Sequence, residues 1–243
     1  MSDCRNCGNP LSSPFCPECG QKSTKQGLSF KQVFADIMNY MFSVESPLWK
    51  TFGTLWTNPG KIGREFISGK RTSYYRPFQY YIFAIVIHLL VGSLFNYDPV
   101  DVQMRMTGVP EDAPAQAVRM TEAGHFMARN INYFLPIWAL VLGLFDRLFF
   151  FKSGYSIAER TAFAFFLIGH FILTITVLVP FTIKFPEADL IKYPVIIGFV
   201  GYGLLSFHKR EYLWSAVKCL VLIPLSFAIY AAISFSITLI FFI

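Results

Sequence analysis

The sequence predicts an all-α integral membrane protein, a five-helix transmembrane bundle that follows a small Cys-rich N-terminal module. Two observations predict this fold class. Only 15% of the 243 residues are charged, against roughly 25% in soluble domains, and the abundant apolar residues form runs long enough to cross a bilayer. Two Cys-x-x-Cys pairs lie in residues 4–19, a segment too short to bury a useful core without a bound metal.

The N-terminal module, residues 1–27 including a polar linker, is predicted to hold a structural zinc ion. Gly follows each pair and permits a left-handed backbone at that position. Two such turns can direct four thiolates at one tetrahedral Zn²⁺ and leave no open coordination position. Iron, two disulfides or a redox-active pair are the alternatives, but no βαβ pattern follows, as a redox motif requires. The predicted metal ligands are Cys4, Cys7, Cys16 and Cys19.

Residues 28–77 are predicted to form short amphipathic helices at the membrane interface. The first has apolar residues at helical spacing from Phe30 to Met41. Ser46-Pro47 marks a second helix start, because Pro is favoured at the first helical position. These stretches are too short or too polar to cross a bilayer. They either lie in the interface, as their Trp and Phe residues indicate, or pack on the cytoplasmic ends of the spans.

A turn at Asn58-Pro59-Gly60 and a third short helix that Gly69 ends complete this segment. Lys70, Arg71 and Arg76 then lead into the first span. These cations lie where anionic lipid head groups would be. We consider two interpretations, an anchor that sets the topology and a specific lipid or phosphate contact.

Residues 78–243 are predicted to form the five-span domain. The third run is the cleanest, the fourth is Gly-rich, and the fifth is longer than the ~20 residues that a crossing requires. A short helix is expected over 114–129, in the loop after the first span. The five runs are 78–97, 131–151, 162–183, 190–207 and 213–243.

Charge distribution predicts the orientation of the spans. With the N-terminus inside, 16 of the 21 Lys and Arg residues fall in or beside cytoplasmic segments, as the positive-inside rule requires. Reduced thiolates at the N-terminus agree with this placement. An odd number of spans puts the C-terminus outside. We therefore expect a multi-pass protein of the bacterial inner membrane, whose net charge of +6 reflects orientation rather than nucleic-acid binding.

Ionisable residues within the spans are the candidates for an intramembrane polar site. His88 and His170 lie within the first and third spans, and Asp146-Arg147 lies near the cytoplasmic end of the second. The simpler interpretation is that each histidine is structural and bonds to a neighbouring helix. One sharper interpretation is that the two histidines join in proton transfer or metal binding. The other is a cytoplasmic charge network in which Asp146-Arg147 and Glu159-Arg160, which flank the loop between the second and third spans, meet Arg71 or Arg76.

The N-terminal part of the chain resembles a known family. The motifs are the Cys pairs of residues 4–21, Asn58-Pro59-Gly60, Gly69-Lys70-Arg71, Tyr75 and Pro77, followed by apolar helices. The Cys-rich start is similar to the common bacterial zinc-ribbon module. Together the motifs resemble a family of uncharacterised bacterial membrane proteins that carries only a domain-of-unknown-function label. The resemblance implies a zinc-ribbon membrane protein and no particular activity.

Functional motifs are otherwise absent from the sequence. It contains no phosphate-binding loop, dinucleotide fingerprint, His-Glu-x-x-His motif or nucleophile elbow, so we predict no enzymatic activity. The first hypothesis is a membrane protein whose cytoplasmic zinc ribbon binds a protein partner. The second is a small transporter, channel or lipid-handling protein. Membrane lipids and one unidentified cytoplasmic or membrane protein are the expected partners.

Overall fold

A computed structural model describes residues 3–4, 7–10, 15–19, 47–107, 115–209 and 212–242 of the chain. The chain divides into two compact units, Met1–Ser46 and Pro47–Ile243, and each is described by itself. The linker expected over 21–27 and the amphipathic helix expected from Phe30 to Met41 lie outside the described residues.

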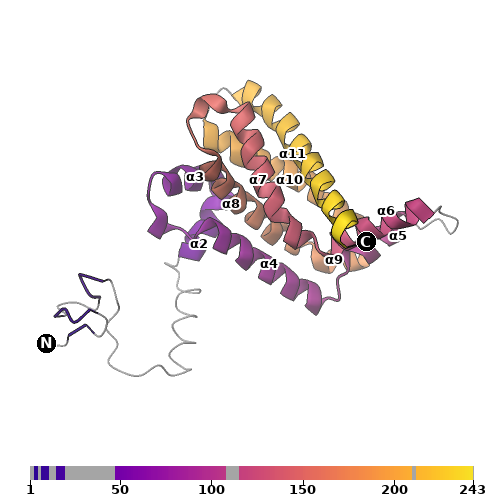
Figure 1. Cartoon of the computed structure of the whole chain (residues 1–243), viewed down its shortest axis with the longest axis horizontal. Helices are drawn as coiled ribbons and strands as arrows, with labels where there is room; N and C mark the ends of the chain where they lie inside the picture. Colours follow the sequence, from indigo (N-terminus) through magenta and orange to yellow (C-terminus); the bar gives the residue numbers. More distant parts are fainter. Residues whose placement is uncertain are drawn as a thin grey trace. The chain divides into compact units, whose positions relative to one another are not determined.

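Every regular element in the described part of the larger unit is helical, as the sequence predicts (Figure 1). Its elements are α2 (Pro47–Thr57), α3 (Pro59–Ile67), η1 (Arg71–Ser73), α4 (Pro77–Leu94), α5 (Pro99–Thr107), α6 (Ala115–Arg129), α7 (Ile131–Phe149), η2 (Phe151–Ser153), α8 (Ile157–Thr176), α9 (Val179–Lys184), η3 (Pro186–Ile191), α10 (Lys192–His208) and α11 (Tyr212–Phe241). The short helix expected over 114–129 is confirmed as α6.

Within the described residues, five helical stretches are long and apolar enough to cross a membrane, the same number as the sequence predicts. They are Arg71–Leu94, Ile131–Phe149, Ile157–Thr176, Pro186–His208 and Leu213–Phe241. The predicted bounds of the third span, 162–183, were wrong at both ends. A capping box between Ser156 and Glu159 starts α8 five residues earlier. The helix ends at Thr176, and Pro180, which lacks the backbone N–H of a continuing helix, lies in the first turn of the separate helix α9.

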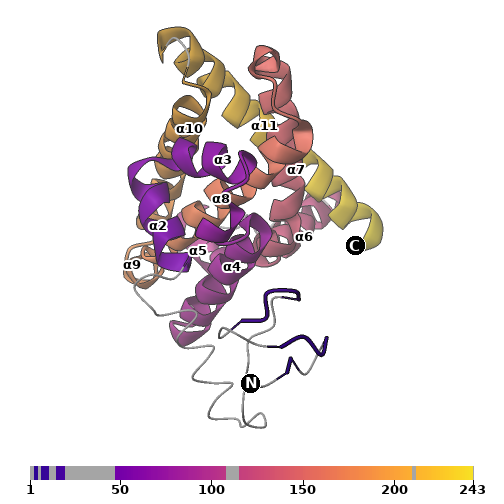
Figure 2. The same ribbon diagram turned by 90° about the vertical axis from the view of Figure 1, so that its left-hand side faces the viewer.

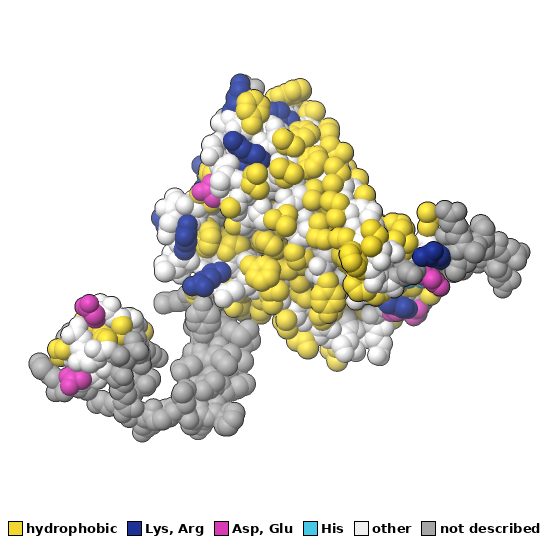
Figure 3. Space-filling view, in the orientation of Figure 1, with side chains coloured by type: hydrophobic (Ala, Val, Ile, Leu, Met, Phe, Trp, Pro, Cys, Tyr) yellow, Lys and Arg dark blue, Asp and Glu magenta, His cyan; other side chains and the backbone are white. Residues whose placement is uncertain are grey.

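Four of the spans form a ring. Helix α8 packs against α7 and α10, and α11 packs against the same two helices from the other side. The fifth span, α4, packs along α8, and Figure 2 shows it in front of the bundle. Trp138 of α7 and Phe166 and Leu167 of α8 are fully buried between these helices. Hydrophobic side chains cover the outer face over α7 and α11 in Figure 3, the surface expected against lipid.

Helices α2 and α3 pack on the bundle. Both contact α8, and α3 also lies against α10. The structure therefore shows packing on the spans, which is one of the two interpretations of this segment. The turn predicted at Asn58-Pro59-Gly60 is shorter in the structure. Asn58 is the N-cap of α3, and its side chain accepts a hydrogen bond from the backbone N–H of Lys61, while Pro59 and Gly60 already belong to the helix. Gly69, at φ 108°, follows the end of α3 as predicted.

The two ends of the bundle differ in charge. One end comprises α3 and the α7–α8 and α10–α11 connections and is called the basic end. It carries Arg64, Arg147, Lys152, Lys209 and Lys218. The other end comprises α5, α6 and η3 and is called the mixed-charge end, because acidic and basic residues alternate there. Figure 3 shows Lys and Arg along the basic end and both signs at the mixed-charge end.

Candidate functional site

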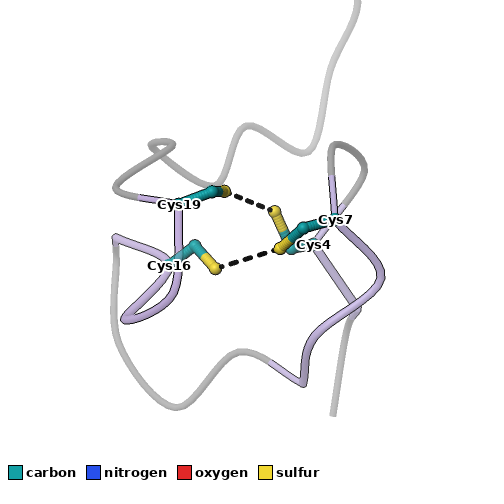
Figure 4. A group of neighbouring side chains, drawn as sticks. All are labelled: Cys4, Cys7, Cys16 and Cys19. Atoms are coloured by element: carbon teal, nitrogen blue, oxygen red, sulfur yellow. Dashed lines mark hydrogen bonds between the residues drawn. The ribbon is translucent and has the colours of Figure 1, made fainter.

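The four predicted metal ligands lie together. The Sγ atoms of Cys4, Cys7, Cys16 and Cys19 all lie within 4.8 Å of one another (Figure 4). Cys4 Sγ is 3.5 Å from Cys19 Sγ, and Cys7 Sγ is 3.5 Å from Cys16 Sγ. The edge of a tetrahedron of thiolates around zinc is about 3.8 Å, given Zn–S bonds of about 2.3 Å. The cluster therefore has the size and the donor set of a tetrahedral metal site.

A tight turn in the first Cys pair presents its thiols. Gly8 has φ 76°, and its N–H donates to the carbonyl of Cys4, while Cys4 N–H donates to the carbonyl of Asn9, both at 2.8 Å. All five cysteines of the chain are described, and all are free thiols, so the cluster contains no disulfide. A backbone hydrogen bond from Asn9 lowers the pKa of Cys7, but the neighbouring thiols and desolvation outweigh it and raise that pKa to about 12.

A buried ion pair joins three spans near the basic end. Asp146 of α7 forms a salt bridge with Arg160 of α8, whose side chain is fully buried. His208 Nε2 of α10 lies 2.6 Å from the other carboxylate oxygen of Asp146. Arg160 also donates to the carbonyl oxygens of Asp146 and Phe150. The charge network expected around Asp146 thus exists, but Arg160 and His208, rather than Arg71 or Arg76, are its members.

The sequence places Arg160 beside Asp146, at the loop between the second and third spans, without pairing the two, and it does not point to His208, which lies at the end of another helical run. Their common depth is the signal that could have identified them. The sequence places Asp146, Arg160 and His208 at the basic-end termini of three predicted spans, so all three lie at one level of the bundle. Arg147, the sequence neighbour of Asp146, points elsewhere and donates to the carbonyl of Phe151 at 2.9 Å.

The two histidines have separate partners. His88 Nδ1 lies 2.9 Å from Thr176 Oγ1, and His170 Nδ1 lies 2.9 Å from the hydroxyl of Tyr80. Tyr80 and His88 are both on α4, two turns and about 12 Å apart along its axis. His88, His170 and the Asp146–Arg147 pair therefore occupy three places rather than one intramembrane polar site.

The predicted lipid or phosphate contact lies around the start of α4. Lys70, Arg71 and Arg76 are all exposed. Lys70 forms a salt bridge with Glu65 at 3.3 Å, and the Arg71 guanidinium lies over the ring of Phe66. Glu65 also accepts a 2.6 Å hydrogen bond from the Tyr74 hydroxyl, which holds the pKa of Glu65 below its usual value. Two of the three cations thus have partners within the segment, and the cluster stays accessible at the surface.

Helix α3 is fastened to the end of α10. Gly60 N–H donates to Ser206 Oγ at 2.8 Å, and the Arg64 guanidinium donates to the carbonyls of Ser206 and Phe207. A Cβ atom on Gly60 would lie 2.2 Å from the backbone of Ser206. Arg64 therefore supplies donors to C-terminal carbonyls of α10 that lack partners within the helix, and glycine permits the close approach.

This segment also carries the similarity to a known family. Residues 45–89 match the family described as "Protein of unknown function (DUF3667)". The matched range contains α2, α3, η1 and most of α4, so it includes the α3 side of the contact with α10 and the start of the first span. The predicted resemblance to a domain of unknown function is confirmed over this range, which does not include the Cys pairs. The chain matches no curated protein and no solved structure.

Proposed function

We propose that the protein is a non-enzymatic, multi-pass membrane protein whose Cys₄ zinc module serves as a protein-interaction surface. The convergence of four thiols within 4.8 Å carries this proposal. Four protein ligands complete a tetrahedral shell, so zinc held there would order the module rather than perform chemistry. The expected partner is a cytoplasmic or membrane protein that binds the ordered surface.

The proposed location is the bacterial inner membrane, with the zinc module in the cytoplasm and the C-terminus outside. Two observations support this orientation. The basic end has the charge expected of cytoplasmic segments, and free thiols are typical of a reducing compartment. The resemblance to a bacterial zinc-ribbon family supports the choice of organism class.

The test compares two cysteine variants of the full chain, extracted gently from its own membrane. Cys16→Ser removes one predicted ligand, whereas Cys219→Ser removes a buried thiol of α11 that is not part of the cluster. Native mass spectrometry and elemental analysis should find one zinc and one stoichiometric protein partner in the wild type and in Cys219→Ser. Cys16→Ser should lose both and still insert into the membrane.

Two results would contradict this proposal. Zinc content unchanged by Cys16→Ser would show that the four cysteines do not hold the metal. Loss of zinc without loss of the partner would show that the ordered module is not the binding surface. Retained phospholipid with no protein partner would instead favour the alternative, a transporter, channel or lipid-handling protein.

A further inference from the structure

The bundle contains a cavity near its mixed-charge end. Its volume is about 660 Å³, and residues of α4, α7, α8, α10 and α11 form its walls. Residues of α5, α6 and η3, the elements of the mixed-charge end, also line it. Small-molecule sites have volumes of roughly 300–1,000 Å³, so this cavity is large enough for a ligand.

The walls of the cavity are mainly apolar. Leu89, Trp138, Phe171, Ile196 and Phe227 are among the side chains that line it. Cavities lined in this way do not hold ordered water well, because water needs two to four polar partners. Leu89 on α4 is 53% exposed, so the cavity is not sealed from the outside. A hydrocarbon chain is the molecule that such walls and the surrounding bilayer both favour.

Polar groups gather at one end of the cavity. Arg129, Asp189 and Lys192 line this end. Lys192 forms a salt bridge with Asp189 at 2.5 Å, and Arg129 forms one with Asp98 at 2.9 Å. Each cation is thus balanced by a carboxylate. Among the described residues, these two pairs offer an anionic head group no excess of positive charge, whereas a zwitterionic head group can pair with both signs.

We propose that this cavity binds one acyl chain of a zwitterionic phospholipid, with the head group at the Lys192–Asp189 and Arg129–Asp98 pairs. The polar end lies at the end of the bundle, the depth at which lipid head groups occur, and the apolar part extends inward beside Trp138. His88, bonded to Thr176, lies in the wall as one of a few polar groups. This binding site is independent of the zinc module.

Two glycines provide a matched pair of variants. A Cβ on Gly92 would meet only the Tyr97 ring at 4.0 Å, and a Cβ on Gly198 would meet nothing within 4 Å, so both positions have room for a larger side chain. Gly92 lines the cavity, whereas Gly198 is exposed and does not. Gly92→Phe should fill the cavity, and Gly198→Phe should leave it open.

Trp138 provides the signal for the test. It is among the residues that line the cavity, and it is fully buried within the bundle, so it is better shielded from annular lipid than the exposed Trp residues. The full chain with Trp49, Trp56 and Trp214 changed to Phe is reconstituted into vesicles of dibromostearoyl phosphatidylcholine, because bromine quenches Trp fluorescence at short range. We expect strong quenching of Trp138 relative to vesicles without bromine. Gly198→Phe should keep this quenching, and Gly92→Phe should lose most of it.

Several outcomes would overturn the proposal. Absence of quenching in the parent protein, or equal quenching in Gly92→Phe, would show that no chain reaches Trp138. Equal quenching by brominated phosphatidylglycerol at low mole fraction would exclude the zwitterionic preference, and quenching by added dibromostearic acid alone would assign the cavity to a free fatty acid. Ala128→Phe, on the α6 wall, repeats the test in case Gly92→Phe misfolds. Zinc content of each sample reports separately on the metal module.

Discussion

At the scale of single residues, burial determines what a charged side chain does. Asp146 and Arg147 are neighbours in sequence, yet Asp146 is buried against Arg160 and His208, whereas Arg147 lies partly exposed and contacts one carbonyl. A charge that is removed from water requires a counter-charge and hydrogen bonds to its remaining atoms. Arg160 meets this requirement with one carboxylate and several carbonyl oxygens, so the pair fixes α7 and α8 in one alignment.

Asp146→Asn should therefore destabilise the bundle far more than Arg147→Gln. Loss of the carboxylate leaves Arg160 buried without a counter-charge, at a cost of about 3–5 kcal/mol, whereas Arg147→Gln should cost less than about 1 kcal/mol. Thermal unfolding in detergent can be followed by the reaction of buried Cys219 with a fluorogenic maleimide. The four N-terminal cysteines are replaced by Ser for this purpose. Equal melting temperatures for the two variants would show that the pair is not needed for stability.

At the scale of elements, close packing determines which segments join the bundle. Helix α3 is short and cannot cross a membrane, but Gly60 and Gly63 allow it to approach α10 and α8 closely. A Cβ on Gly63 would lie 2.7 Å from the Phe163 ring. The hydrogen bonds of Gly60 and Arg64 to Ser206 and Phe207 then fix the position of the helix. The α3 side of this contact lies within residues 45–89, the range that matches the family, and its α10 side lies outside that range.

The glycine contact predicts opposite results for two identical substitutions. Gly60→Ala should lower the melting temperature of the bundle, because its Cβ would overlap the Ser206 backbone, which cannot move without shifting α10. Gly53→Ala on α2 has open space around its Cβ, and the better helix propensity of Ala should leave stability unchanged or raise it by up to about 1 kcal/mol. The same maleimide assay measures both. A harmless Gly60→Ala would contradict the close approach of α3 and α10.

At the scale of the whole membrane unit, the five spans and the two ends predict the topology. Connections at the basic end and connections at the mixed-charge end should lie on opposite sides of the membrane. The basic end should face the cytoplasm, because translocation of clustered Lys and Arg is unfavourable. This orientation therefore also sets the side of the membrane to which the Asp146 cluster and the cavity each lie closer.

This topology can be measured with single cysteines in a chain whose native cysteines are replaced by Ser. Ser68→Cys follows α3 at the basic end, and Glu122→Cys lies on α6 at the mixed-charge end, both at exposed positions. A membrane-impermeant maleimide added to intact bacteria that express the protein should label Glu122→Cys only. Labelling of Ser68→Cys should require disrupted membranes. The opposite pattern would invert the proposed orientation, and labelling of both would be incompatible with five spans.

The properties that could be predicted from the amino-acid sequence are those that depend on local composition and spacing. These are the all-helical class, the number of spans, the α6 helix and the identity of the cysteines that cluster. Each follows from the length of an apolar run or from the spacing of the cysteines. Neither depends on how the helices pack against one another. The start of α8 was not predicted, because the apolar run alone indicated residue 162, whereas the capping box of Ser156 and Glu159 begins the helix at Ile157.

Which of these features contact one another depends on how the helices pack, and local sequence does not show it. Asp146 is paired with residues 14 and 62 positions away, and Gly60 contacts a serine 146 positions away, because the rotation and depth of each helix bring them together. Helical periodicity indicates one apolar face but not the neighbour that covers it, so the partners of His88 and His170 could not be read from sequence. The cavity has the same origin, since it is the volume left where five helices and their connections do not fill the space between them.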